Sequence, residues 1–203
     1  DEVAGSYACR GLTAYSALKK ADLKKGQNSV VIISAGGLGL LSLKIIQAAY
    51  SINPIVVDID DDKLDLAKKA GASAVINSKD GNIYEKIAEL TEGGATSVID
   101  FVGAAETFEL ASGMFGMKRG GTYVIVGLIG GQTNLQLPMT TLTARTIRGI
   151  YVGSLAEMGE LMQLVKEGKI EHVDVEKRNA STANETLNDL KNGKINGLVC
   201  LTH

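Results

Sequence analysis

The sequence predicts a doubly wound α/β fold, in which helices cover both faces of a parallel sheet. Short β-rich runs alternate with helical stretches along the chain, as they do in parallel sheets with crossover helices. The β-rich runs are apolar at nearly every position, which is typical of strands that are covered on both faces. Of the 203 residues, 45% are hydrophobic and 22% charged, so the chain can form one large domain with a sizeable core.

The expected elements follow from the spacing of apolar residues. The strands are expected at Val30–Ser34, Ile55–Asp58, Ala74–Asn77, Ser97–Phe101, Tyr123–Val126, Thr146–Tyr151 and Leu198–Leu201. The helices are expected at Leu12–Ala21, Leu38–Tyr50, Asp61–Ala70, Ile83–Thr91, Ala105–Phe115 and Leu155–Glu167.

Local signals mark several element ends. Asp61 or Asp62 can cap the helix that follows, and Gly71 is expected to end it. Gly130–Pro138 breaks the alternation, and we expect a loop with a short extra strand there. Thr146–Tyr151 is expected to be the strand at one edge of the sheet.

The stretch Ser29-Val-Val-Ile-Ile-Ser-Ala-Gly-Gly-Leu-Gly39 is a short strand that leads into glycines and then a helix. Glycine lets the backbone approach a pyrophosphate, and a helix N-terminus offers free N–H groups to phosphates. Ser34 stands at the first glycine position of the Gly-x-Gly-x-x-Gly pattern, followed by Gly36 and Gly39. We expect a dinucleotide site, weakened by the strain of Ser34 in the turn.

Asp58 lies nineteen residues after Gly39, at the end of the second expected strand. A carboxylate there accepts hydrogen bonds from both hydroxyls of the adenosine ribose. It also repels a 2′-phosphate, and Asp60, Asp61 and Asp62 add negative charge. The sequence therefore predicts NAD rather than NADP.

Composition argues against other partners. A net charge of −2 disfavours nucleic acid, and no apolar run reaches the roughly eighteen residues that cross a bilayer. Cys9 and Cys200 can pair by number alone, but no other feature suggests a secreted, disulfide-bonded protein. We expect a cytoplasmic protein without nucleic-acid or membrane partners.

Further motifs are spread over the chain. They are Cys9-Arg-Gly-Leu-Thr-Ala-Tyr-Ser-Ala-Leu18, Lys25-Gly26, Asp58 with Lys63, Ala70-Gly-Ala72, Val98-Ile-Asp100, Gly120-Gly121, Val126-Gly127 and Gly193-Lys194. With the glycine turn, they resemble the nucleotide-binding domain of the medium-chain dehydrogenases, the zinc-dependent alcohol dehydrogenase group. The resemblance covers essentially all of residues 1–203 and implies one Rossmann-type dinucleotide-binding domain. In the full-length enzyme it implies hydride transfer between an alcohol or carbonyl substrate and NAD.

The resemblance also implies which residues bind NAD. Thr13 would lie near the nicotinamide, and Leu38 would back its ring. The pyrophosphate would lie at Gly36, Gly37, Leu38 and Gly39, and the adenosine ribose at Asp58 and Lys63. The remaining wall would consist of Phe101, Val102, Val126, Gly127 and Leu128. Where many relatives carry an arginine near the last strand, this chain reads Ile195-Asn-Gly-Leu198.

Zinc is implied for the full-length enzyme only. Such enzymes have an N-terminal GroES-like catalytic domain that holds two zinc ligands and the proton relay, and we expect residues 1–203 not to contain that domain. Cys9 resembles the third ligand. Catalytic zinc needs about three protein ligands, so we expect Cys9 to behave here as a small buried hydrophobe and residues 1–203 alone to be inactive.

Two other functions remain open at this point. One is a zinc-free quinone or enoyl reductase of the same superfamily, and the other is a nucleotide-binding module without catalysis. We also expect a homodimer or tetramer through the edge strand Thr146–Tyr151, because an exposed edge has unpaired N–H and C=O groups. The alternative is a monomer whose edge is covered by the loop Gly130–Pro138.

Overall fold

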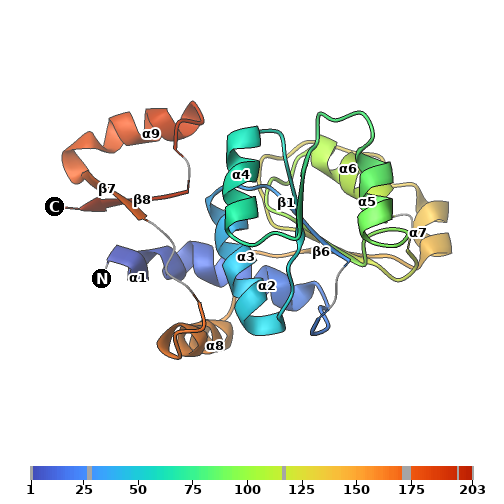
Figure 1. Ribbon diagram of the computed structural model, residues 1–203, viewed down its shortest axis with the longest axis horizontal. Coiled ribbons are helices and arrows are strands. Elements are labelled where there is room, and N and C mark those ends of the chain that lie inside the picture. Colours follow the sequence, from blue (N-terminus) through green and yellow to red (C-terminus); the bar gives the residue numbers. More distant parts are fainter. Residues whose placement is uncertain (1, 27–28, 116–117, 171–174, 196, 203) are drawn as a thin grey trace.

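A six-stranded parallel sheet with helices on both faces forms the body of the molecule (Figure 1). The computed structural model describes residues 2–26, 29–115, 118–170, 175–195 and 197–202. The strand order is β3-β2-β1-β4-β5-β6, so the chain adds strands to one side of β1 up to β3 and to its other side from β4 onwards. The reversal point of this order lies between β1 and β4. This order confirms the predicted doubly wound, Rossmann-type fold, in which ligands bind at the carboxyl ends of the strands beside the reversal point.

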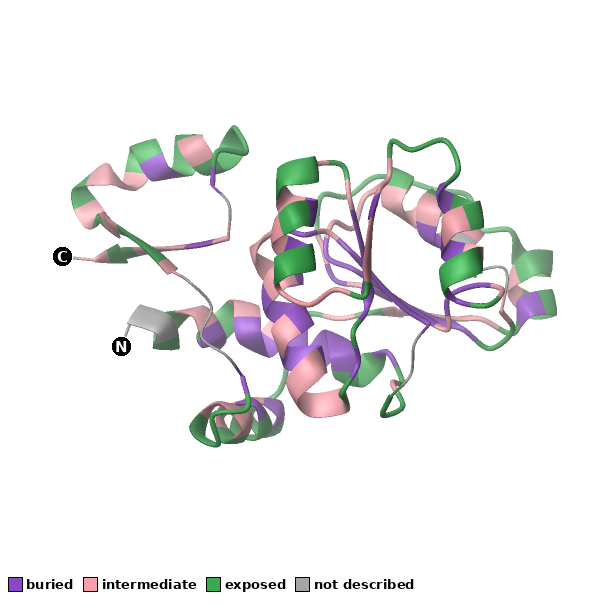
Figure 2. Cartoon of the chain, in the orientation of Figure 1, coloured by how far each residue is buried: buried purple, intermediate pink, exposed green. Residues whose placement is uncertain are grey.

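The strands of this sheet agree with the predicted runs to within two residues at each end. They are β1 Val30–Ile33, β2 Ile55–Asp58, β3 Ala74–Asn77, β4 Ser97–Asp100, β5 Thr122–Ile125 and β6 Thr146–Gly149. The strand β1 is buried throughout, and its neighbours β2 and β4 pair with it in parallel (Figure 2).

Helices pack on each face through alternate residues of the strands. They are α2 Leu12–Lys20, α3 Gly37–Tyr50, α4 Asp61–Lys69, α5 Ile83–Leu90, α6 Ala105–Phe115 and α8 Leu155–Lys166. Val30 and Ile32 of β1 belong to the core that includes residues of α2, α3, α4 and α8. Val31 and Ile33 belong to a second core with residues of α5 and α6. Burial of both sets explains why the strands read as continuous apolar runs.

The N-terminal helix begins earlier than predicted. A short α1, Glu2–Ser6, continues through a π-helical turn η1, Tyr7–Gly11, into α2. Gly11 permits this path, because a Cβ there would lie 2.9 Å from the Tyr7 ring. The buried Tyr7 anchors the segment.

The last expected strand was assigned to the wrong sheet. The strand β8, Leu198–Thr202, pairs in parallel with β7, Val175–Asn179, in a separate two-stranded sheet that lies beside α1 (Figure 1). A short η2, Ala180–Thr182, and α9, Ala183–Lys191, connect the two strands. The sequence Val-Glu-Lys-Arg-Asn of β7 has a single apolar residue, so it carried no strand signal.

The expected extra strand after Gly130 was also wrong. Within the described residues, this region forms only a single bridge between Ala104 and Gly130 and then the helix α7, Leu137–Thr143. Pro138 lies in the first turn of α7, where a proline is favourable because its missing N–H would have no partner inside the helix. The proline therefore marked a helix start rather than a loop.

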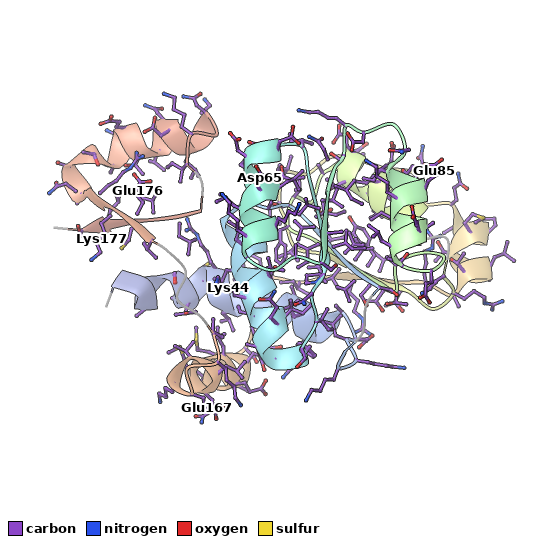
Figure 3. The ribbon with its side chains drawn as sticks, in the orientation of Figure 1. Lys44, Asp65, Glu85, Glu167, Glu176 and Lys177 are labelled. Carbon is purple, nitrogen blue, oxygen red and sulfur yellow. The ribbon has the colours of Figure 1, made fainter. Side chains whose placement is uncertain are left out.

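Most charged side chains lie on the outer surface of the molecule, with Asp100 and Glu157 among the buried exceptions. Asp65 on α4, Glu85 on α5 and Glu176 on β7 are all exposed (Figure 3). Among the described residues, no helix combines the length and apolar character needed to cross a bilayer.

Candidate functional site

The glycine turn after β1 brings several backbone groups close together. Ser34 has φ of 102°, a left-handed conformation that non-glycine residues rarely adopt. Its hydroxyl accepts a hydrogen bond from Gly36 N at 3.1 Å. A Cβ on Gly39 would lie 1.9 Å from the Ser34 carbonyl oxygen, so only glycine fits at this position. The third glycine of the pattern is thus required by the close approach of helix and turn.

The first turn of α3 lies against the C-terminal strand. A Cβ on Gly37 would lie 2.9 Å from the Gly197 carbonyl oxygen and 3.1 Å from Leu198 Cδ2. The sequence shows that no arginine stands at 195–198, but it gives no sign that Gly197 and Leu198 contact the glycine turn. Asn196 lies outside the described residues.

Asp58 lies at the carboxyl end of β2, next to the same turn. Its Oδ2 accepts a hydrogen bond from Ala35 N at 2.6 Å, and its Oδ1 accepts from Ile59 N at 2.7 Å. The carboxylate is half-buried, and an ionised carboxylate has about four acceptor sites. Asp60 N also donates to Oδ1, at 3.2 Å, so one acceptor position remains, on Oδ2, for a ribose hydroxyl.

The cap of α4 differs from the expected one. Asp60, rather than Asp61 or Asp62, is the N-cap, and its side chain accepts hydrogen bonds from Asp62 N and Lys63 N. Lys63 Nζ lies 3.5 Å from Asp60 Oδ2. Desolvation opposes ionisation of Asp60, but the hydrogen bond from Lys63 N and the Lys63 charge outweigh it and lower the Asp60 pKa. Lys63 is thus held beside the end of β2.

The loops after β4 and β5 touch each other. A Cβ on Gly103 would lie 2.0 Å from the Gly127 carbonyl oxygen, and a Cβ on Gly127 would lie 2.1 Å from the Val102 carbonyl carbon. Phe101 and Val126 are buried core residues, whereas Leu128 is 81% exposed. Of the five predicted wall residues, Phe101 and Val126 are therefore buried, Val102 and Gly127 are half-buried, and Leu128 faces solvent.

Two further predicted residues are half-buried. Thr13 lies on α2, which contacts α3, and Leu38 lies in the first turn of α3, packed on the core. Together with the glycine turn and Asp58, Leu38 belongs to the carboxyl edge of the sheet.

Cys9 is exposed on η1, so the expectation of a buried Cys9 was wrong. It lines a hollow of about 360 Å³ that also includes Arg10 and Cys200. Both cysteines are free. The described residues contain no group of three or more histidine, cysteine, aspartate or glutamate side chains that can hold a metal. Cys9 therefore does not form a zinc site from the described part of the chain alone.

A larger hollow of about 540 Å³ lies elsewhere, between α6 and α7. Phe108, Met139 and Arg145 line it, together with residues of the loop before α7. Burial lowers the pKa of Arg145. None of the predicted cofactor residues lines this hollow.

Residues 37–167 match the family described as zinc-binding dehydrogenase. The chain belongs to the zinc-binding dehydrogenase family. An NAD-dependent alcohol dehydrogenase of Sulfurisphaera tokodaii is 32% identical over 195 residues, which cover 96% of this chain and 56% of that protein. This member of the family thus spans about half the length of the curated relatives that it matches.

Solved structures agree with this assignment. The alcohol dehydrogenase of Aeropyrum pernix is 29% identical, with a TM-score of 0.86 over 97% of this chain and 56% of that chain. The acetophenone reductase of Geotrichum candidum, solved in complex with NAD, is 27% identical, with a TM-score of 0.83 over 99% of this chain and 55% of that chain.

Proposed function

We propose that residues 1–203 form the NAD-binding domain of an NAD-dependent, zinc-containing alcohol dehydrogenase. The observation that carries this proposal is the contact between Asp58 and Ala35, which joins the expected ribose acceptor to the glycine turn. Both lie beside the reversal of strand order, where dinucleotides bind in such folds. The printed names of the relatives support NAD and an alcohol as the reactants of the complete protein.

Each part of NAD then has a place on the chain. The pyrophosphate meets the N–H groups of Gly37, Leu38 and Gly39 and lies beside Gly36, whose N–H donates to the Ser34 hydroxyl. Asp58 and Lys63 hold the adenosine ribose. Thr13, Leu38, Phe101, Val102, Val126, Gly127 and Leu128 surround the remaining half. Bound NAD supplies the nicotinamide carbon that exchanges hydride with the substrate. The chain contributes binding and orientation of that ring.

Zinc belongs to the complete protein in this proposal. Cys9 donates one thiolate ligand, and residues outside the described part donate the others. The exposure of Cys9 supports this role, because a ligand shared with another segment must be accessible. It favours the zinc-containing function over a zinc-free reductase.

The proposal includes a cytoplasmic homodimer or tetramer. With only two cysteines in 203 residues, the composition favours a reducing compartment. The strand β6 lies at the edge of the sheet, with β5 on its inner side. Such an edge can pair with a second copy.

Calorimetric titration of the purified chain with NAD and NADP tests the nucleotide assignment. We expect saturable NAD binding that is weak, because Ser34 is strained in the turn and because Leu198 stands near the last strand where many relatives carry an arginine. NADP should bind more weakly than NAD by about tenfold or more, because the Asp58 carboxylate repels its 2′-phosphate. Equal or tighter NADP binding contradicts the role of Asp58, and binding of neither nucleotide contradicts the proposed function.

A further inference from the structure

Asp100 is a fully buried acid at the carboxyl end of β4. Its Oδ2 lies 2.7 Å from both the Tyr123 hydroxyl and the Thr107 hydroxyl. Its Oδ1 accepts hydrogen bonds from Val102 N at 2.8 Å and Gly103 N at 3.0 Å. Four donors thus converge on one carboxylate. A carboxylate is costly to bury, so its presence in the core needs a structural or functional explanation.

The backbone carbonyl of Asp100 serves the neighbouring loop. It accepts hydrogen bonds from Val126 N at 2.9 Å and Gly127 N at 3.1 Å. The side chain of Asp100 therefore shapes the loop after β4, and its main chain fixes the loop after β5. The close packing of Gly103 on Gly127 then locks the two loops together.

These loops lie on a defined half of the cofactor site. Asp58 marks the adenosine half at the end of β2, on one side of the reversal point. The strands β4 and β5 lie on the other side, which receives the second mononucleotide. The two loops that Asp100 holds are therefore on the nicotinamide half.

We infer that Asp100 is a positioning residue that holds the loops after β4 and β5 in the shape that receives the nicotinamide half of NAD. This inference rests on the proposed function. A carboxylate suits the role because it only accepts hydrogen bonds, and all four groups around it donate. An asparagine of the same shape has one acceptor oxygen instead of two and no charge. Its hydrogen bonds to Val102 N and Gly103 N are therefore weaker, and the Tyr123 and Thr107 hydroxyls must accept from its N–H₂ group instead of donating.

The variant Asp100→Asn tests this role, with Ser97→Ala as its matched control. Ser97 is a buried polar residue at the opposite end of the same strand, where its hydroxyl donates to the Ala21 carbonyl oxygen at 2.9 Å. Both variants lose buried hydrogen bonds, but only Asp100→Asn changes the loops. ADP probes the adenosine and pyrophosphate part, NAD probes the whole site, and NADH fluorescence reports the environment of the nicotinamide ring.

For Asp100→Asn we expect NAD affinity to fall about tenfold while ADP affinity stays within about twofold of the parent. The fluorescence enhancement of bound NADH should also be lost. For Ser97→Ala we expect a lower melting temperature and an unchanged ratio of NAD to ADP affinity. Equal losses of NAD and ADP in Asp100→Asn, or no loss of either, overturn the inference.

Tyr123→Phe decides the question if Asp100→Asn does not fold. It removes one donor and keeps the ring, which packs edge-on against Phe108 at 5.6 Å. We expect a loss of NAD affinity of about threefold with ADP affinity unchanged. A parent chain that binds ADP but not NAD contradicts the positioning role alone, whereas a parent that binds neither contradicts the proposed function as well.

Discussion

Asp58 and Ala35 are joined by a hydrogen bond of 2.6 Å between Ala35 N and Asp58 Oδ2. The residue expected to select the ribose therefore also supports the glycine turn. Asp58→Ala should weaken NAD binding by about tenfold, because it removes the ribose acceptor and the support together. Asp58→Asn can keep an acceptor for Ala35 N, but it removes the charge and turns an N–H₂ group towards Ile59 N and Asp60 N.

Both substitutions at Asp58 should narrow the gap between NAD and NADP affinities, since each removes the repulsion of a 2′-phosphate. Parallel titrations with the two nucleotides measure the gap. Asp65→Asn, an exposed change on α4, provides the control and should leave the gap as it is in the parent. A gap that persists in Asp58→Ala would mean that another group selects the cofactor.

Ser34→Gly should both stabilise the chain and tighten NAD binding. The left-handed backbone at Ser34 costs about 1–3 kcal/mol of folding free energy, which glycine relieves. Glycine also loses more conformational entropy on folding, which offsets roughly 0.5–1 kcal/mol of this gain. We therefore expect a net stabilisation of about 1 kcal/mol. The change also releases Gly36 N from the Ser34 hydroxyl, so that the N–H can meet a phosphate. Urea unfolding and NAD titration measure the two effects.

Ser51→Gly is the matched control for the Ser34 change. Ser51 has φ of 56° at the C-cap of α3, the far end of the same helix. Glycine there should relieve backbone strain without any effect on NAD affinity. If Ser34→Gly gains stability but leaves NAD affinity at the parent value, the Ser34 hydroxyl does not compete with phosphate.

Leu198→Arg should tighten NAD binding several-fold. Leu198 is buried next to Gly37 in the first turn of α3, so an arginine there must extend out of the core to reach the pyrophosphate, and it should also lower the melting temperature. The gain should shrink as salt is added, because it is electrostatic. Leu201→Arg, on an exposed position of the same strand, should give no gain. Equal effects of both arginines would indicate a general charge effect.

Glu157 should make stability depend on pH. It is buried, accepts hydrogen bonds from the N–H and the hydroxyl of Ser154, and pairs with Lys20 Nζ at 3.3 Å. Burial opposes ionisation, but these hydrogen bonds outweigh it and lower the Glu157 pKa below 4.5.

A lowered pKa in the folded state stabilises the protein above the unfolded pKa and loses this contribution as the pH falls through the folded value. The melting temperature should therefore fall as the pH drops below about 4.5, and Glu157→Gln should flatten part of that fall. Calorimetric scans of both proteins from pH 3 to pH 7 measure it. Parallel curves for the two proteins would exclude a contribution from Glu157.

The sequence predicts the main sheet well because its strands are buried on both faces, so that Val30–Ile33 and its neighbours read as continuous apolar runs. The glycine turn can also be predicted from the sequence, because the Ser34 carbonyl oxygen lies so close to Gly39 that no side chain fits there. The strand β7 could not be found, because its polar sequence depends on pairing with β8. The network around Asp100 was missed for a similar reason, since its donors come from three separate segments.

The edge strand β6 provides a test of the proposed dimer. Thr146 N donates to Gly121 O and Ile150 N donates to Ile125 O, so the N–H groups of alternate residues of this strand point towards β5. The N–H of Ile147 therefore points to the free edge.

Ile147→Pro should remove an edge donor and produce monomers, whereas Ile150→Pro should break a bond inside the sheet and lower the melting temperature. Light scattering measures the mass of each variant. A parent chain that is monomeric at high concentration contradicts pairing through β6. It leaves the proposed nucleotide site unaffected, because that site lies at the carboxyl ends of β1, β2, β4 and β5 and not on the free edge of β6.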